Sequence, residues 1–396
     1  MSKRVAILGS TGSIGRSALE VLAHLGPPFR PVALSAHRQT GKLLEQVRAC
    51  RPSAVALSGE HPSAALVEEI RSLGAAVYRG PGGLVEMVQR DDVDVVLAGI
   101  VGAAGLPAAL AAVAAGKTLA LANKEALVVG GSLLVPEARR RGVTILPVDS
   151  EHSAVFQAMQ CGRLHEVRRV LLTASGGPFL NATPGQIESA TVEEALNHPT
   201  WRMGHKITID SATMFNKALE IIEACWLFDL PPEKVEVVVH PESIIHSMVE
   251  FVDGSVVAQL SPPDMRTPIQ YALTYPHRAE GLGRRLDLRK ALSLNLAPPD
   301  VGRFPAIRLA YEAVKAGGTM GAVLSAANEG AVAAFLARRI PFGRIAQLVE
   351  SAMESHGPVR SPALDELLEA DRWARQTVEE LIEPSSASQR AYSKAV

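Results

Sequence analysis

Residues 1–150 alternate short aliphatic runs with amphipathic segments, and this alternation limits the possible folds more than any other feature of the 396-residue chain. The predicted strands are residues 4–8, 31–35, 54–57, 94–98, 118–122 and 143–148, and the predicted helices are residues 14–25, 40–50, 63–73, 107–115 and 132–141. Strands that are each followed by a helix pair in parallel, and the helices cover both faces of the sheet. The alternation therefore predicts an α/β protein with an N-terminal Rossmann-like doubly wound sheet.

The pattern changes after residue 150. Strand-like VRRVLLTAS and a hairpin pattern that turns at Asp253-Gly254 predict a central α+β domain over residues 151–276. Residues 277–305 are rich in Arg, Pro and Gly and are predicted to be a linker. Helical patterns at residues 305–316, 319–338, 342–355 and 363–382 predict a C-terminal four-helix domain over residues 306–396, with fraying at 384–396.

Composition narrows the class of protein. The net charge of −1 offers no basic excess for binding nucleic acid. Cys50, Cys161 and Cys225 stand alone, which argues against a zinc site or a disulfide framework and suits a reducing compartment. Residues 95–116 carry no charge, but Gly102, Gly105 and Pro107 interrupt them, so they read as strand, turn and helix rather than a membrane span. We expect a cytoplasmic protein without a nucleic-acid or membrane partner.

The first predicted strand ends in a glycine-rich turn. The stretch VAILGSTGSIG places Gly9, Gly12 and Gly15 between a strand and a helix, where backbone amides and the helix dipole can bind a pyrophosphate. The spacing only approximates the dinucleotide fingerprint, and a tight turn without a ligand is the alternative. The second strand ends in Ser-Ala-His-Arg without an acid for a ribose 2′-hydroxyl, so Arg38 favours NADP unless it is simply solvated.

Two polar clusters follow later strands, at the sheet edge where doubly wound proteins bind ligands. Lys124 and Glu125 come just after residues 118–122, although they could be ordinary solvated charges at the start of a helix. Asp149 and Glu151 end the next strand-like run, and if the strand continues their side chains point the same way. Two carboxylates so placed repel each other unless a cation lies between them. The pair therefore predicts a cation site.

Further candidates lie downstream. HKITIDSATMFNKALEIIEACW is predicted to form a strand, a turn at Asp210-Ser211 and a helix, on which Asn216, Lys217 and Glu220 share one face. An ordinary surface ion pair is the alternative reading of that face. A turn at Ser175 can direct amides and a hydroxyl at an anion. Residues 197–204, NHPTWRMG, read as a loop in which Trp201 is either core or part of a lid.

Taken in order, GSTGSIG, LANKEAL, VDSEHSA, TASGGPF, HPTWRMG and DSATMFNKALE resemble the signature segments of the 1-deoxy-D-xylulose 5-phosphate reductoisomerase family. The resemblance runs over nearly the full length of the chain. It implies a homodimer that converts a phosphorylated keto-sugar to 2-C-methyl-D-erythritol 4-phosphate in the non-mevalonate route to isoprenoids. It also implies that NADPH and Mg²⁺ or Mn²⁺ are the cofactors.

The resemblance assigns roles to particular residues. The cofactor-binding set is Thr11, Gly12, Ser13, Ile14, Ala36, His37, Arg38, Asn123, Glu125 and Gly204, and Ala36 departs from the glycine common in the family. The metal ligands are Asp149, Glu151 and Glu220. The substrate-binding set is Lys124, Ser150, Glu151, Ser175, His198, Trp201, Ser211, Asn216, Lys217 and Glu220. The residues expected to serve catalysis are Lys124, Asp149, Glu151, His198 and Glu220.

Two other functions fit parts of the sequence. A semialdehyde dehydrogenase can start with a similar glycine turn, but it needs a thiolate nucleophile, and Cys161 has no evident activating context. A non-catalytic NADP-sensing module would explain residues 1–150 and leave the downstream acidic and anion-binding segments without a role.

Overall fold

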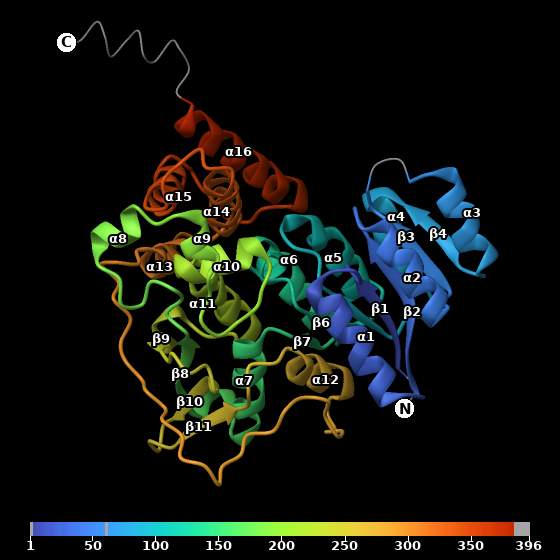
Figure 1. The fold of residues 1–396 in the computed structure, drawn as a ribbon, viewed down its shortest axis with the longest axis horizontal. Coiled ribbons are helices and arrows are strands. Elements are labelled where there is room, and N and C mark those ends of the chain that lie inside the picture. Colours follow the sequence, from blue (N-terminus) through green and yellow to red (C-terminus); the bar gives the residue numbers. More distant parts are fainter. Residues whose placement is uncertain (1–2, 60–61, 384–396) are drawn as a thin grey trace, which may run out of the picture. The chain divides into compact units, whose positions relative to one another are not determined.

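The computed structural model describes residues 3–59 and 62–383, so the fraying predicted for residues 384–396 concerns a segment outside the described residues. Contacts divide the chain into two compact units, and Figure 1 labels the helices and strands named below. Unit 1 comprises residues 1–127, 133–168 and 244–292, and unit 2 comprises residues 128–132, 169–243 and 293–396. The division follows contacts in space rather than chain order.

Unit 1 contains a parallel sheet of seven strands in the order β4-β3-β2-β1-β5-β6-β7. Its strands are β1 (Lys3–Leu8), β2 (Phe29–Ala36), β3 (Ala54–Leu57), β4 (Ala76–Arg79), β5 (Val95–Ala98), β6 (Thr118–Leu121) and β7 (Ile145–Pro147). The intervening helices are α1 (Ser13–Leu25), α2 (Thr40–Cys50), α3 (Ala64–Ser72), α4 (Gly80–Val88), α5 (Leu106–Ala114) and α6 (Lys124–Arg141). The strand order reverses between β1 and β5, which is the point where open α/β sheets bind ligands. The predicted doubly wound sheet is confirmed.

The sequence patterns missed β4 and α4, and they began α6 too late. β4 lies at the edge of the sheet and is not fully buried, so it lacks the continuous apolar run of the central strands. The first half of α6 is buried on all sides, so it shows no amphipathic period. Only its second half, from residue 132, has the amphipathic period from which the helix was predicted.

The rest of unit 1 comes from later in the chain. It contains α7 (Ser150–Ala158), the antiparallel strands β10 (Ile245–Phe251) and β11 (Val256–Leu260), and α12 (Arg266–Thr274). The hairpin turns at Asp253-Gly254 as predicted, with Gly254 at φ +86°. Ile269 and Leu273 of α12 belong to the same buried cluster as Val5 and Ile7 of β1. Apolar burial therefore holds α12 to the N-terminal sheet.

Unit 2 combines a parallel strand pair with helices. Its elements are β8 (Val167–Ala174, which begins in unit 1), α8 (Pro184–Glu188), α9 (Val192–Leu196), α10 (His205–Ala212), α11 (Phe215–Phe228), β9 (Val235–Val239), α13 (Ala306–Ala316), α14 (Met320–Leu336), α15 (Arg344–Glu354) and α16 (Leu364–Ile382). The four predicted C-terminal helices are confirmed. Within the described part of the chain, no helix is long and apolar enough to cross a membrane.

The strand predicted before Asp210 is wrong, because residues 205–212 form helix α10. The β-branched residues Ile207, Thr208 and Ile209 suggested a strand, since such side chains are enriched there. In the helix, Thr208 and Ile209 are buried, and Lys206 pairs with Asp210 one turn later at 2.7 Å. Burial and this ion pair outweigh the intrinsic preference.

Candidate active site

The glycine turn between β1 and α1 packs closely against neighbouring backbone because Gly9, Gly12 and Gly15 have no side chains. Gly9 has φ +80°, and a Cβ there would lie 3.0 Å from the carbonyl oxygen of Gly99. A Cβ on Gly15 would lie 2.4 Å from the carbonyl oxygen of Gly9. Only glycine at position 15 therefore lets α1 lie this close to the turn. Gly12 is the N-cap of α1 and has no side chain to occupy the helix N-terminus. These positions suit a phosphate group.

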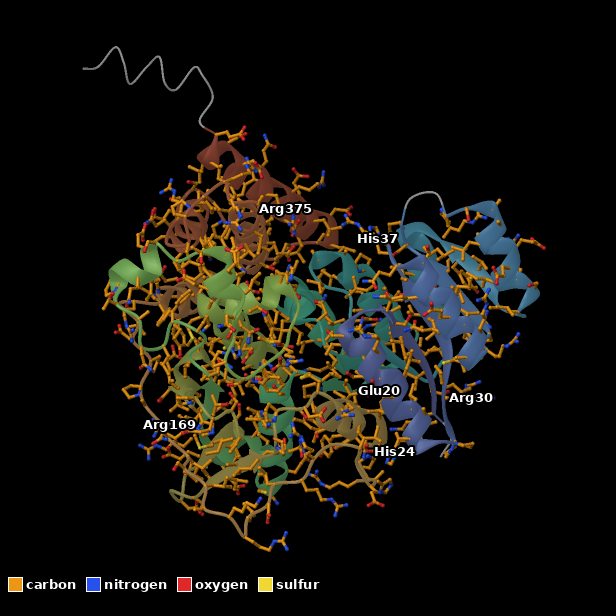
Figure 2. All side chains as sticks on the ribbon, in the orientation of Figure 1. Glu20, His24, Arg30, His37, Arg169 and Arg375 are labelled. Atoms are coloured by element: carbon orange, nitrogen blue, oxygen red, sulfur yellow. The ribbon has the colours of Figure 1, made fainter. Side chains whose placement is uncertain are left out.

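The end of β2 lies beside this turn. The backbone N–H of Gly9 donates to Ser35 Oγ over 2.9 Å, and the backbone N–H of Ser10 donates to the Ser35 carbonyl. Ala36 is buried, whereas His37 (labelled in Figure 2) and Arg38 are exposed just after the strand. No acid occupies the end of β2, as the sequence suggested.

Helix α6 begins with three buried polar residues. Asn123 is the N-cap: its Oδ1 accepts the backbone N–H of Ala126 over 2.6 Å, and its amide donates to the Gly102 carbonyl over 3.0 Å. Lys124 is only 7% exposed, and its ammonium pairs with Asp149. Solvated charges at a helix start, the alternative reading, would not be buried in this way.

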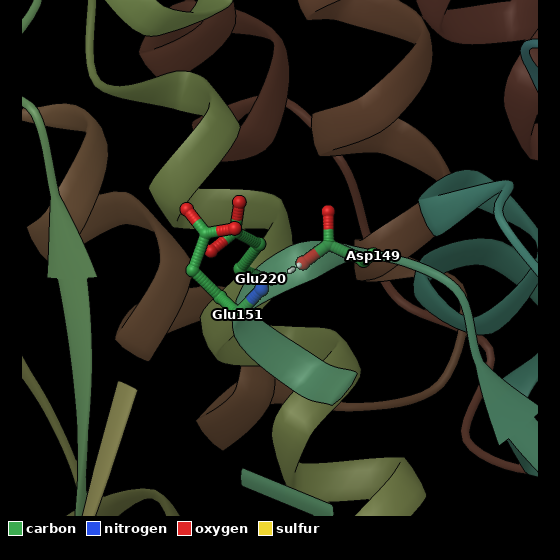
Figure 3. Close-up of side chains that lie close together, drawn as sticks. All are labelled: Asp149, Glu151 and Glu220. Carbon is green, nitrogen blue, oxygen red and sulfur yellow. Dashed lines mark hydrogen bonds between the residues drawn. The ribbon is translucent and has the colours of Figure 1, made fainter. Parts of the chain in front are cut away.

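Asp149 and Glu151 lie at the start of helix α7, so the conditional expectation that a strand continues through them is wrong. β7 ends at Pro147, and Asp149 is the N-cap of α7. The backbone N–H of Glu151 donates to Asp149 Oδ1 over 3.2 Å; Figure 3 marks this bond with a dashed line. The Ser150 hydroxyl donates to the Glu151 carboxylate. Capping, rather than strand alternation, holds these side chains in place.

The charge state of Asp149 follows from its neighbours. Burial by itself would raise the pKa of this carboxyl, but the Lys124 ammonium and His152 hold the pKa well below its usual range. His152 Nδ1 lies 3.0 Å from Asp149 Oδ1. Asp149 is therefore ionised and acceptor-only at neutral pH. His152 was not among the residues expected from the sequence, and its spacing of three residues from Asp149 is the signal that could have indicated it.

Unit 2 carries the second group of candidates on α11. Asn216, Lys217 and Glu220 share one face of this helix, as their spacing predicted. The Lys217 ammonium pairs with Glu220, and Asn216 Nδ2 donates to Glu220 Oε1 over 2.6 Å. The side chains of Lys217 and Glu220 are 3% and 0% exposed. This burial excludes the ordinary surface ion pair considered above.

His198 joins two serines from different elements of unit 2. Its Nε2 lies 3.0 Å from Ser175 Oγ, after β8, and 3.1 Å from Ser211 Oγ on α10. Its Nδ1 accepts the backbone N–H groups of Thr200 and Trp201 over 3.1 and 2.9 Å. An Nδ1 that accepts two bonds carries no proton, so the ring is neutral with its hydrogen on Nε2. Burial lowers the His198 pKa, which favours the same form.

The turn after β8 is held against α10. A Cβ on Gly177, which has φ +64°, would lie 2.8 Å from the carbonyl oxygen of Ser211. Residues 197–204 lack regular structure, as predicted, and Gly204 is the N-cap of α10. The link from the Trp201 backbone to His198 was missed by sequence reasoning, because it depends on the path of the loop rather than on residue type.

Three family models match consecutive parts of the chain. A 1-deoxy-D-xylulose 5-phosphate reductoisomerase model matches residues 5–131, that enzyme's C-terminal domain matches residues 145–228, and a DXP reductoisomerase C-terminal domain matches residues 260–377. A relative from Chlorobium phaeobacteroides with this enzyme's name is 50% identical over 381 residues, covering 96% of this chain and 99% of the relative. The chain belongs to the 1-deoxy-D-xylulose 5-phosphate reductoisomerase family.

Solved structures of reductoisomerases share the fold. The Zymomonas mobilis enzyme in complex with NADPH is 42% identical with a TM-score of 0.90, covering 97% of this chain and all of that chain. A reductoisomerase in complex with NADPH, fosmidomycin and magnesium is 40% identical with a TM-score of 0.91, covering 96% and 99%. The α/β fold class and the family inferred from the sequence are therefore confirmed.

The arrangement around His198 leads to a prediction about how activity depends on pH. The folded pKa of His198 is lowered, so the bonds from Thr200 and Trp201 are complete above the unfolded value of about 6.5 and are lost as pH falls through the folded pKa. We expect kcat/KM to fall in that range, and trypsin cleavage after Arg202 to accelerate.

Replacing His198 with glutamine removes the titrating group. The His198→Gln variant should have lower kcat/KM at neutral pH and a flatter acidic limb, both measured from NADPH oxidation between pH 5 and 8 at constant ionic strength. An unchanged acidic limb in this variant would assign the titration to another group.

Proposed function

We propose that the chain catalyses the NADPH- and divalent-metal-dependent isomerisation and reduction of 1-deoxy-D-xylulose 5-phosphate to 2-C-methyl-D-erythritol 4-phosphate, in non-mevalonate isoprenoid biosynthesis. The observation that carries this proposal is the near-full-length match to reductoisomerases, including solved complexes with NADPH and magnesium. The buried carboxylates with their lysine partners and the His198 arrangement support it, since the reaction needs ligands for a divalent metal and hydrogen-bond donors for a phosphorylated substrate.

The cofactor is assigned to the glycine turn and the end of β2. Thr11, Gly12, Ser13 and Ile14 lie at the N-terminus of α1, where amides and the helix dipole favour the cofactor phosphates. His37 and Arg38 are assigned to the adenosine end, where the absence of an acid suits a 2′-phosphate. The full proposed set adds Ala36, Asn123, Glu125 and Gly204.

The metal is assigned to Asp149, Glu151 and Glu220, three acidic side chains that form a group able to hold a metal ion (Figure 3). The donors fit, because all three are carboxylates and Mg²⁺ and Mn²⁺ prefer oxygen ligands. Asp149 is held ionised by Lys124 and His152, and Glu220 is held by Lys217 and Asn216. When bound, the ion stabilises negative charge on the substrate oxygens.

The substrate is assigned to side chains of both units. Ser175, His198, Ser211, Asn216 and Lys217 supply donors for its phosphate, and Lys217 supplies the charge. Lys124 and Ser150 are assigned to the reacting oxygens, where the Lys124 ammonium can donate a hydrogen bond as charge develops. Trp201 is assigned to a lid, residues 197–204, that excludes water from the reactive intermediate.

The proposal also covers the location, the oligomeric state and the domain organisation of the chain. The chain acts as a cytoplasmic homodimer, an inference from the family resemblance and from the cysteine usage. In chain order, residues 1–150 are assigned as the NADPH-binding domain, which also supplies Lys124 and Asp149 to the active site, and residues 151–276 are assigned as the catalytic domain for metal and substrate. Residues 277–305 are assigned as a linker and residues 306–396 as the C-terminal four-helix domain. Size-exclusion chromatography with light scattering would test the dimer directly.

The proposed activity has a direct test. NADPH oxidation should follow addition of 1-deoxy-D-xylulose 5-phosphate in the presence of Mg²⁺, should stop after exhaustive chelation and should return when Mg²⁺ or Mn²⁺ is restored. Oxidation that continues after chelation would refute the metal requirement. The absence of any substrate-dependent oxidation in folded protein would refute the function.

Cofactor preference depends on Arg38. We expect the wild-type chain to prefer NADPH strongly, and Arg38→Asp to weaken NADPH binding by about tenfold or more because a charge-assisted contact to the 2′-phosphate becomes a repulsion. NADH binding should change little. Dissociation constants of both cofactors, measured by fluorescence titration, give the comparison, and equal wild-type affinities would defeat the assignment.

The alternative functions are not favoured. A semialdehyde dehydrogenase needs a reactive thiolate, but burial raises the pKa of the Cys50 thiol, and it raises that of Cys225 to about 12. A sensing module without catalysis would not account for the buried carboxylates and the His198 arrangement. Insensitivity of the activity to thiol reagents would exclude the dehydrogenase.

A further inference from the structure

A polar cavity of about 150 Å³ lies in unit 1, lined by residues that the proposed function does not use. Its walls come from the last turn of α7, from β11, from α12 and from the segment after α12. The residues that matter here are Gln157, Gln259, Arg266, Gln270, Tyr271 and Arg278. Of these lining residues, Arg278 is exposed to solvent.

Arg278 is held in a defined orientation without an acidic partner. Its guanidinium carbon lies 4.7 Å from the centroid of the Tyr271 ring, and its Nη2 donates to Gln157 Oε1 over 2.8 Å. Within residues 3–59 and 62–383, no carboxylate forms an ion pair with it. The stack and the hydrogen bond orient a planar cation whose remaining N–H groups are available.

The other groups of the cavity leave this charge uncompensated. Arg266 is already paired with Asp264 at 2.7 Å, so it adds little net charge. Gln270 Nε2 donates to the carbonyls of Ala279 and Glu280 over 2.9 and 3.0 Å, which fixes the segment that carries Arg278. The cavity is therefore a preformed, positively charged space.

We propose that this cavity binds a small tetrahedral oxyanion of the phosphate or sulfate class. A volume of this size accommodates about five non-hydrogen atoms, at roughly 30 Å³ for each group the size of a water. The Arg278 fork matches two oxygens of such an ion, and the Gln259 amide supplies a third donor. The assignment is independent of the proposed function, because none of these residues belongs to the candidate active site.

The site has a structural connection to α7. This helix carries Ser150 and Glu151 in its first turn and Gln157 in its last, about 11 Å along the axis from Ser150. Arg278 contacts Gln157 of α7 and Tyr271 of α12. An ion bound to Arg278 would therefore strengthen the link between the C-terminal end of α7 and α12. Occupancy should therefore stabilise unit 1.

The test uses inorganic phosphate and the full chain. A Lys217→Ala background removes the proposed substrate-phosphate pocket, and saturating NADPH occupies the proposed cofactor site at the glycine turn and Arg38, so that the remaining phosphate binding reports on this cavity. Phosphate is titrated at constant ionic strength against KCl, with isothermal calorimetry for affinity and thermal unfolding for stability. We expect saturable binding with one ion per chain and a rise in Tm that chloride does not reproduce.

Matched variants locate the ion. Adding Arg278→Ala should weaken phosphate binding by about tenfold or more, whereas Arg285→Ala, an exposed arginine on the same segment paired with Glu280, should leave it unchanged. Gln259→Leu keeps the Arg278 stack intact and should weaken binding as well, which covers the case in which Arg278→Ala misfolds. Sulfate should compete with phosphate.

Three outcomes would overturn the proposal. They are the absence of saturable binding in the Lys217→Ala background, equal affinity with and without Arg278 in folded proteins, and an equal effect of chloride. Failure of the proposed function is recognised separately, by the absence of NADPH oxidation.

Discussion

Replacing Glu220 with glutamine is expected to reduce kcat by about three orders of magnitude. Glu220 is fully buried and its carboxylate is held by Lys217 and Asn216. Glutamine keeps the size of the side chain but replaces an anionic oxygen with an amide nitrogen, which cannot ligate Mg²⁺. The metal dissociation constant should rise, while NADPH binding should be unchanged because the glycine turn is untouched. Steady-state kinetics at several Mg²⁺ concentrations, with calorimetric metal titration, measure both effects.

The control for this variant is Glu223→Gln. Glu223 is another buried carboxylate of α11 that has no proposed role as a ligand. Its replacement should leave the metal affinity close to wild type, so a general loss of carboxylate charge from the helix is separated from loss of a ligand. A Glu220→Gln protein with near-normal turnover and metal affinity would remove Glu220 from the metal site.

The second large effect is expected from Lys217→Ala. Lys217 and Glu220 form a buried pair, and removing the lysine leaves an uncompensated buried carboxylate. This should lower the free energy of unfolding by about 3–5 kcal/mol in metal-free protein. KM for the phosphorylated substrate should rise by about 10²-fold, because a charge-assisted phosphate contact is lost.

Metal addition gives this prediction a second readout. If Glu220 is a ligand, Mg²⁺ supplies the missing positive charge and should restore much of the lost stability of Lys217→Ala, as a ligand that binds only the folded state does. Urea unfolding with and without Mg²⁺ measures the restoration. Lys315→Ala, which removes an exposed lysine from α13, is the control. Unchanged KM and unfolding free energy in Lys217→Ala would place the phosphate pocket elsewhere.

Features of this chain that depend on near neighbours could be predicted from the sequence. The helix α11 and the shared face of Asn216, Lys217 and Glu220 follow from the helical period. The alternation of apolar runs with amphipathic segments is likewise enough to predict a parallel sheet covered by helices. An apolar run indicates a strand buried on both faces, and an amphipathic segment indicates a helix buried on one face. Where the pattern is absent, as in β4 and in the first half of α6, the prediction failed.

The resemblance to known enzymes added the roles of particular residues, which the periodicity of the sequence does not contain. It named Glu220 as a third acidic ligand together with Asp149 and Glu151, and it named His198 as a contact of the substrate. Neither assignment follows from spacing. Both remain predictions for the variants described above.

The sequence by itself determined which functional residues follow which strands: a glycine turn after β1, basic residues after β2, and acidic residues after β7. The tertiary structure alone decided how those residues are held. Residues 205–212 became a helix because Ile209 is buried there, and Asp149 became an N-cap whose charge is maintained by Lys124, which is distant in sequence. Burial removes water from these groups and strengthens every contact between them, and burial depends on how distant segments pack together.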